Sequence, residues 1–169
     1  MDKAMLANRI RVPVITGGVA LTIGLLTGCA QSTGHDEMNP EESKQQMTSL
    51  LDLTVEALGG AGWREEPSPY ANGCNLWGED NGVSFVSGRM APPSADQASD
   101  IALVERLWKE QGFDTRIVGP TDTDSTIQLY GTHGPMKGVS FYADTRGASL
   151  YGESLCVIGD LASVIEGDL

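Results

Sequence analysis

The sequence predicts an α+β fold, in which an antiparallel sheet of about four to five strands carries two helices packed on one face, with one disulfide. Two segments place apolar residues at helical spacing, and each is followed by strand-like segments. The connections between those segments are short and local, which favours antiparallel pairing. We assign residues 39–169 to this single domain.

The first helix is predicted to begin at Asn39. Asn39 can cap it, Pro40 suits the first helical position, and Glu42 can reach back to the cap. The apolar residues that follow share one helical face: Met47, Leu50, Leu51, Val55 and Leu58. Gly59 and Gly60 are expected to end the helix.

The next predicted elements are an extended segment and a hairpin. Pro67 and Pro69 interrupt the extended segment, residues 63–70. Asp80-Asn81-Gly82 lies between two partly apolar runs, and Asn-Gly is the strongest short hairpin signal. Cys74 is therefore expected on or just before a strand, and residues 83–87 on its partner.

The second helix is predicted after Pro92-Pro93. Ser94 and Gln97 have the spacing of a capping box, and Asp96 adds favourable first-turn charge. Its apolar face comprises Ala98, Ile101, Val104, Leu107 and Trp108, and Gly112 ends it.

Four further strands are predicted at residues 113–118, 125–130, 138–143 and 148–155, separated by turn-rich segments. Cys156 directly follows the last of them. The acidic tail from Gly159 onward can form a loose helical turn.

The N-terminus has the organisation of an export signal. Lys3, Arg9 and Arg11 precede residues 12–26, which are uncharged and rich in Val, Ile and Leu. A bilayer-spanning helix needs about twenty apolar residues, so this run of fifteen has the length of a signal-peptide core instead.

The signal ends in Leu26-Thr27-Gly28-Cys29, which resembles the lipobox of bacterial lipoproteins. The resemblance implies that the Cys29 sulfur receives a diacylglyceryl group and that cleavage falls between Gly28 and Cys29. Residues 1–28 are then a signal peptide, and residues 29–38 are a lipidated N-terminus with a flexible tether. The expected location is the outer face of the plasma membrane, through the lipid on Cys29.

Charge and cysteine content limit the function of the exported part. The chain has 11 basic and 23 acidic residues, and residues 1–28 hold three basic residues and one acid, so the remainder has a net charge of −14. Such acidity argues against nucleic-acid binding. If Cys29 is lipidated, Cys74 and Cys156 remain, and outside the cytosol such a pair is expected to form a disulfide.

The whole pattern resembles small actinobacterial cell-envelope lipoproteins of the LppA-like kind. The shared features are the lipobox, a capped helix, Trp63 opening the first strand and Gly73-Cys74. A second helix ending in Gly-Phe and a final strand reaching Cys156 match too. The resemblance implies the fold and location, and it implies no catalytic residues.

No catalytic or metal site is predicted, and no cofactor. Residues 121–126 alternate oxygen side chains as a calcium loop does, but Ile127 and His133 stand where such a loop needs Gly and Glu. The segments around Ser140 and Ser154 each lack the second glycine of a nucleophile elbow. His133 is the one possible catalytic base in the domain, and it would need an acid such as Asp124.

The aromatic residues Tyr70, Trp77, Tyr130, Tyr142 and Tyr151 have two interpretations. They can form a binding surface, since such rings suit glycan stacking and protein contacts. They can also fill the core of the sheet, which is the favoured interpretation.

We therefore expect a non-enzymatic interaction or binding module of the cell envelope, with an envelope protein as a possible partner. The alternatives are a small envelope hydrolase using His133, and a minimal ligand-carrier or transporter-associated lipoprotein.

Overall fold

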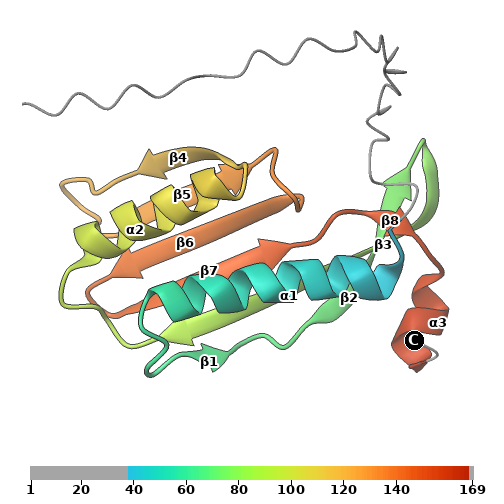
Figure 1. Ribbon diagram of the computed structural model, residues 1–169, viewed down its shortest axis with the longest axis horizontal. Helices are drawn as coiled ribbons and strands as arrows, with labels where there is room; N and C mark the ends of the chain where they lie inside the picture. Colours follow the sequence, from blue (N-terminus) through green and yellow to red (C-terminus); the bar gives the residue numbers. More distant parts are fainter. Residues whose placement is uncertain (1–37, 168–169) are drawn as a thin grey trace, which may run out of the picture. The chain divides into compact units, whose positions relative to one another are not determined.

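An antiparallel sheet with helices on one face makes up the described part of the chain. The computed structural model describes residues 38–167 (Figure 1). In chain order the elements are α1 (Pro40–Ala57), β1 (Arg64–Glu65), β2 (Tyr70–Leu76), β3 (Glu79–Ala91), α2 (Gln97–Glu110), β4 (Asp114–Val118), β5 (Ile127–Thr132), β6 (Gly138–Asp144), β7 (Gly147–Glu153), β8 (Val157–Ile158) and α3 (Leu161–Glu166).

These elements confirm the α+β class, the antiparallel sheet and the disulfide. The expected strand number was wrong: within residues 38–167 the sheet has eight strands, not four to five, and there is a third helix. Two of the additional strands, β1 and β8, are two residues long. A two-residue strand shows no alternation, so periodicity does not reveal it.

The sheet is organised around β3. Its strand order is β1-β3-β7-β6-β5-β4, and β2 and β8 also pair with β3. β3 has 13 residues, so each of its edges accommodates two partners in succession. Gly82 lies between Cys74 of β2 and Ile158 of β8, and further along Val86 lies between Tyr70 of β2 and Glu153 of β7.

Helix α1 begins as the sequence predicts. The Asn39 side chain accepts a hydrogen bond from the Glu42 backbone N–H at 2.9 Å, and the Asn39 N–H donates to Glu42 Oε2 at 3.0 Å. This is a complete capping box, which satisfies two backbone donors that the helix leaves unpaired. Gly59 and Gly60 follow the helix with positive φ angles of 88° and 70°.

Helix α2 begins two residues later than the cap prediction implied. Its N-cap is Asp96, which accepts from the Ser99 N–H at 3.0 Å. The predicted cap, Ser94, accepts instead from the Asp96 N–H at 3.0 Å. Both residues have cap chemistry, and a carboxylate is the stronger acceptor at the positive end of a helix.

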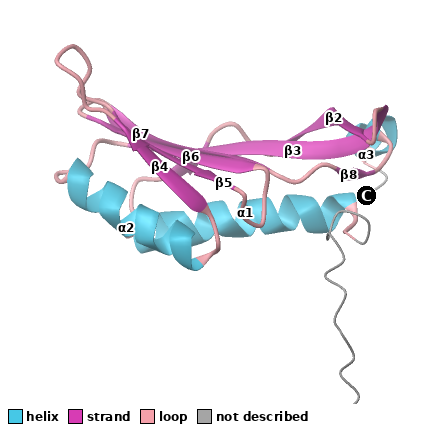
Figure 2. Ribbon diagram, turned by 90° about the horizontal axis from the view of Figure 1, so that it is seen from above, coloured by secondary structure: helices cyan, strands magenta, loops and turns pink. Residues whose placement is uncertain are grey.

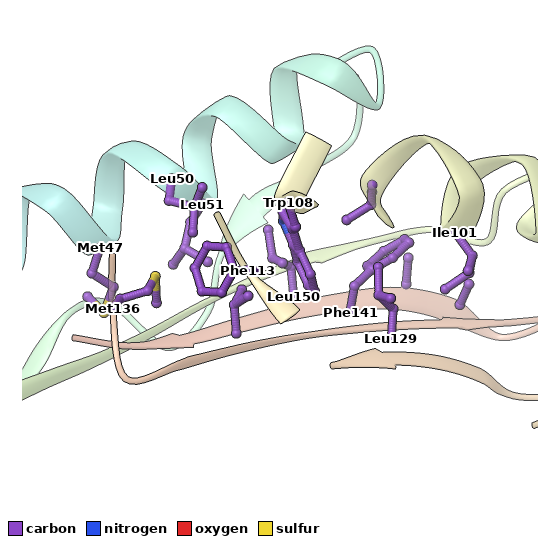
Figure 3. Packing of buried hydrophobic residues seen from close by; sticks show 14 of the residues in the cluster. Met47, Leu50, Leu51, Ile101, Trp108, Phe113, Leu129, Met136, Phe141 and Leu150 are labelled. Carbon is purple, nitrogen blue, oxygen red and sulfur yellow. The ribbon is translucent and has the colours of Figure 1, made fainter. Parts of the chain in front are cut away.

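The core lies between the helices and one face of the sheet. Figure 2 shows α1 and α2 on the same side of the central strands. Figure 3 shows the apolar faces of both helices directed at side chains of the sheet, with Trp108 between them. The labelled side chains are buried: Met47, Leu50, Leu51, Ile101, Trp108, Phe113, Leu129, Met136, Phe141 and Leu150.

A charged cluster also links α1 to the sheet. The Arg89 side chain, 8% exposed, lies 2.8 Å from Asp52 of α1 and 3.2 Å from Glu65 of β1. It also donates to Ser87 Oγ and to the Gly88 carbonyl oxygen. The buried guanidinium is therefore compensated from three elements, as a buried charge requires.

The predicted hairpin turn was misplaced. Asn81 and Gly82 lie inside β3, and the two-residue turn is Trp77-Gly78, between the paired residues Leu76 and Glu79. Both turn residues have positive φ, 54° for Trp77 and 87° for Gly78, as a type I′ turn requires. Gly82 serves a different purpose: a Cβ there would lie 2.5 Å from Cys156 Sγ.

Candidate functional site

The face of the sheet opposite α1 and α2 is the most distinctive surface of the described residues. Along β6 and β7 every second residue is buried against the helices. Successive strand residues point to opposite faces, so the intervening residues face away from both helices. Figure 2 shows this second face without a helix over β5, β6 and β7 among the described elements.

Three tyrosines from neighbouring strands lie side by side on this open face. Tyr130 of β5 and Tyr142 of β6 have ring centroids 6.0 Å apart, and Tyr142 and Tyr151 of β7 are 6.4 Å apart. Their planes meet at 84° and 73°, the edge-to-face arrangement that aromatic pairs favour. We call Tyr130, Tyr142 and Tyr151 the tyrosine row.

Hydrogen bonds and a cation hold the row in place. The Tyr130 hydroxyl donates to Gln128 Oε1, and the Tyr142 hydroxyl donates to the Tyr130 oxygen at 3.4 Å. The Arg116 guanidinium lies 5.1 Å from the centre of the Tyr130 ring. The hydrogen bond with Tyr142, and then burial, raise the pKa of Tyr130.

One hollow beside the row results from small side chains. It has a volume of about 330 Å³, with Tyr130 and Tyr151 as walls and Gly138 and Ser140 at its base. Gly138 has no side chain, and the nearest atom to a Cβ there would be 3.7 Å away. Glu153 closes one side and is held by Lys137 at 2.6 Å.

A second hollow, of about 650 Å³, lies beside Tyr142 and Gln128. Asp144 and Arg146 form an ion pair at its side, with Nη2 of Arg146 2.6 Å from Oδ2 of Asp144. The Arg146 guanidinium holds the pKa of Asp144 well below its usual range. The open face therefore combines aromatic rings, hydroxyl groups and fixed charges, and the two hollows are both open to solvent.

The preference for core filling by the aromatic residues was wrong. The three row tyrosines are half-buried on the open face, and Tyr70 and Trp77 are 48% and 69% exposed. The sequence contained a signal for the row, since each row tyrosine directly follows a buried apolar residue: Leu129, Phe141 or Leu150. Which strands are neighbours depends on the sheet order, so the row itself was not predictable.

His133 lies in the β5–β6 turn, and it does not pair with Asp124. Its Nδ1 is 3.2 Å from Asp114 Oδ2 and 3.3 Å from Thr132 Oγ1. A catalytic relay needs the acid on one ring nitrogen and the nucleophile on the other, whereas here both contacts engage Nδ1. The His133 and Asp114 side chains are also 80% and 81% exposed, so neither is desolvated.

The other sequence candidates have structural roles. The Ser154 hydroxyl is buried, accepting from the Phe85 N–H and donating to the Leu155 carbonyl oxygen. Asp124 accepts from the Thr126 N–H at 2.9 Å within its own loop. Within residues 38–167 no three His, Cys, Asp or Glu side chains are grouped to hold a metal ion.

The two cysteine predictions have different outcomes. Cys74 and Cys156 are joined by a disulfide, which connects β2 to the residue before β8. The lipobox, Leu26-Thr27-Gly28-Cys29, and residues 1–28 lie outside the described residues. None of the helices that the structure describes is both long enough and apolar enough to cross a bilayer.

Comparison with known proteins shows likeness at the level of the fold. The chain matches no family model and no curated protein. Among solved structures it is similar to a DUF4853 family protein from Actinomyces odontolyticus, with a TM-score of 0.54 and 17% identity. The match covers 73% of this chain and 72% of that one, so most of the α+β domain has a counterpart in a solved structure.

Proposed function

We propose that this chain is a lipid-anchored, extracytoplasmic protein of the cell envelope whose domain is a non-enzymatic binding module, with the tyrosine row as its binding surface. The observation that carries this proposal is the row itself, three neighbouring tyrosines on a sheet face that no described helix covers. The lipobox-like segment supports the location, as does the disulfide, because disulfides persist in oxidising compartments. The proposal includes the resemblance of the sequence to LppA-like lipoproteins, which implies the same location.

The chemistry of the row suits binding. Tyrosine rings supply large contact area at low conformational cost, and tyrosine is enriched among residues that dominate binding energy. Cross-strand contacts already fix the three rings, so little rotamer freedom remains to be lost when a ligand binds. Ser140 lies between two of the rings, and its hydroxyl group can donate or accept a hydrogen bond in the 330 Å³ hollow.

A minimal ligand carrier is the second candidate. The hollow between Tyr130 and Tyr151 favours it, because about 330 Å³ is at the lower end of the volumes that small-molecule sites have. The hydrolase alternative is not favoured, since the Nδ1 atom of His133 faces both Asp114 and Thr132.

Replacing Cys29 by serine tests the anchor. We expect C29S to lose all incorporation of labelled palmitate and to leave the membrane fraction or remain unprocessed, because the serine hydroxyl does not form the thioether. The matched control is C74S/C156S, which removes the other two cysteines and should remain labelled. Labelling that persists in C29S would show that the lipid is attached to another residue.

Removing rings from the tyrosine row tests the binding surface. A photoreactive residue at Ser140, between two of the rings, is expected to crosslink a ligand or partner in cells, and one at Arg106 on α2 is not. Y142S/Y151S should weaken that capture at least about tenfold, because losing a dominant contact costs about 2 kcal/mol or more.

Y142F/Y151F is the conservative control, since it retains the rings and removes only the hydroxyl groups. It should keep most of the capture if ring contact area dominates. Equal capture from Ser140 and Arg106, or capture that ignores the loss of both rings, would contradict the proposed surface.

A further inference from the structure

Four segments meet at one end of the domain: the start of α1, the β2–β3 turn, β8 and α3. Figures 1 and 2 agree in placing them together. A Cβ on Gly159, next to β8, would lie 2.9 Å from Pro40 Cγ, and the Ser43 hydroxyl donates to the Leu155 carbonyl oxygen at 2.9 Å. Leu161 of α3 lies against Gly73 of β2, where a Cβ would be 3.5 Å from Leu161 Cδ2.

This end presents the most exposed large apolar side chains of the described residues. Trp77 in the β2–β3 turn is 69% exposed, Ile165 of α3 is 68% exposed and Ile158 of β8 is 50% exposed. Every other exposed large apolar side chain between residues 38 and 167 is less accessible. Apolar residues that gather on one part of a surface indicate an interaction site, whereas scattered ones do not.

The backbone conformation of Trp77 indicates that the exposure of its side chain has a function. Trp77 has φ 54° at the first central position of its turn, where asparagine or glycine is strongly preferred. Its side chain gains little from burial because it is 69% exposed, and its backbone adopts a conformation that large residues disfavour. The turn holds it there, with the Gly78 N–H donating to Asn75 Oδ1 at 2.8 Å.

We propose that this end of the domain rests on the outer surface of the lipid bilayer, with the Trp77 indole at the boundary between headgroups and acyl chains. The inference rests on the proposed lipid anchor at Cys29. Nine residues separate Cys29 from Asn39, and a segment of that length reaches at most about 30 Å. Since α1 begins at this end, the anchor holds Trp77 within reach of the membrane.

The chemistry of the contact is apolar. Tryptophan prefers the membrane–water interface, where its ring is buried and its N–H remains hydrated. The same end carries Glu41, Glu42, Asp160 and Glu166, which anionic lipids repel. We therefore expect the contact to form on zwitterionic lipid and to weaken as anionic lipid is added.

Membrane contact at this end leaves the tyrosine row accessible. Strand β3 runs from the β2–β3 turn toward the opposite end of the sheet (Figure 1). With the Trp77 end on the bilayer, the rest of the sheet extends away from the membrane. The open face is then directed parallel to the membrane plane rather than into the lipid.

Brominated lipids test the proposal, because bromine on an acyl chain quenches tryptophan fluorescence only at close range. Full-length lipidated protein is reconstituted in phosphatidylcholine vesicles, with or without brominated chains. We expect brominated chains to lower the fluorescence of the wild-type protein, and W77N to lose that quenching. W63F is the matched control and should retain it, since Trp63 packs against the core.

W77N separates a membrane role from a folding role. Asparagine is favoured at positive φ, so W77N should fold with unchanged or increased thermal stability while it loses quenching. Fluorescence that is equal in brominated and ordinary vesicles would overturn the inference, as would quenching that survives in W77N or strengthens with anionic lipid.

The intact mass of the purified protein separates the two proposals. If Cys29 carries no lipid, the proposed anchor fails. If Cys29 is lipidated and Trp77 is not quenched, the anchor stands and the membrane contact of Trp77 is wrong. A protein that crosslinks to Trp77 in place of quenching would overturn the contact with lipid in the same way.

Discussion

C74S/C156S is expected to lower the free energy of unfolding by about 2–4 kcal/mol. The bond joins residues 82 positions apart, and the chain-entropy cost of closing a loop of that length gives an upper value of about 4.5 kcal/mol. Urea unfolding of the full-length protein, followed by tryptophan fluorescence and extrapolated linearly, measures the change. Reduced wild-type protein should match the double variant, and two free thiols in unreduced wild-type protein would contradict the bond.

Gly82 provides an independent test of how the disulfide packs. A Cβ on Gly82 would lie 2.5 Å from Cys156 Sγ and 3.0 Å from Cys74 Sγ. G82A should therefore destabilise the oxidised wild-type protein more than it destabilises C74S/C156S, where the smaller serine oxygens can move apart. An equal cost in both backgrounds would show that the disulfide does not lie against Gly82.

Local chemistry explains why the helices were predictable. Asn39, Pro40 and Glu42 satisfy backbone groups within one turn, so the capping box forms whatever surrounds it. The apolar faces of both helices are equally local, because side chains three and four residues apart share a face. The lipobox-like segment is also local, and its meaning depends on its position after a charged and then apolar N-terminus.

The hairpin at Asn81-Gly82 was mispredicted for a reason that is not local. Gly82 is required because Cys74 and Cys156 approach the backbone of β3 at this position. Cys74 lies 8 positions before Gly82 in the sequence, and Cys156 lies 74 positions after it. A glycine that accommodates a distant side chain has the same local signature as a glycine that makes a turn. The actual turn begins with Trp77, which turn preferences disfavour.

The candidate binding face also depended on long-range pairing. Alternation places Tyr130, Tyr142 and Tyr151 on the side opposite their buried neighbours, and this much is readable from each strand alone. The contacts between rings need β5, β6 and β7 to be adjacent and in one register, with Tyr142 opposite both Gln128 and Ser149. Periodicity within one strand tells which face each residue occupies, but not which residue of the next strand lies opposite it.

The core contains a buried polar pair that the apolar pattern of the helices conceals. The Trp108 indole N–H of α2 donates to Thr54 Oγ1 of α1 at 3.1 Å, and that hydroxyl donates to the Leu50 carbonyl oxygen at 2.9 Å. Trp108 and Thr54 are both completely buried. The pair therefore links the two helices above the sheet, and the buried indole N–H depends on the Thr54 hydroxyl for its hydrogen bond.

W108A is expected to lower the free energy of unfolding by about 3–5 kcal/mol, because it removes a fully buried ring and leaves a cavity between both helices and the sheet.

T54V preserves volume but leaves the buried indole N–H without its acceptor, which costs about 1–3 kcal/mol. In W108F/T54V both polar partners are replaced by apolar groups, so the double variant should be more stable than the sum of W108F and T54V predicts. Urea unfolding of the wild-type protein, W108F, T54V and W108F/T54V measures this coupling. Strictly additive costs would show that the indole and the hydroxyl stabilise the core independently.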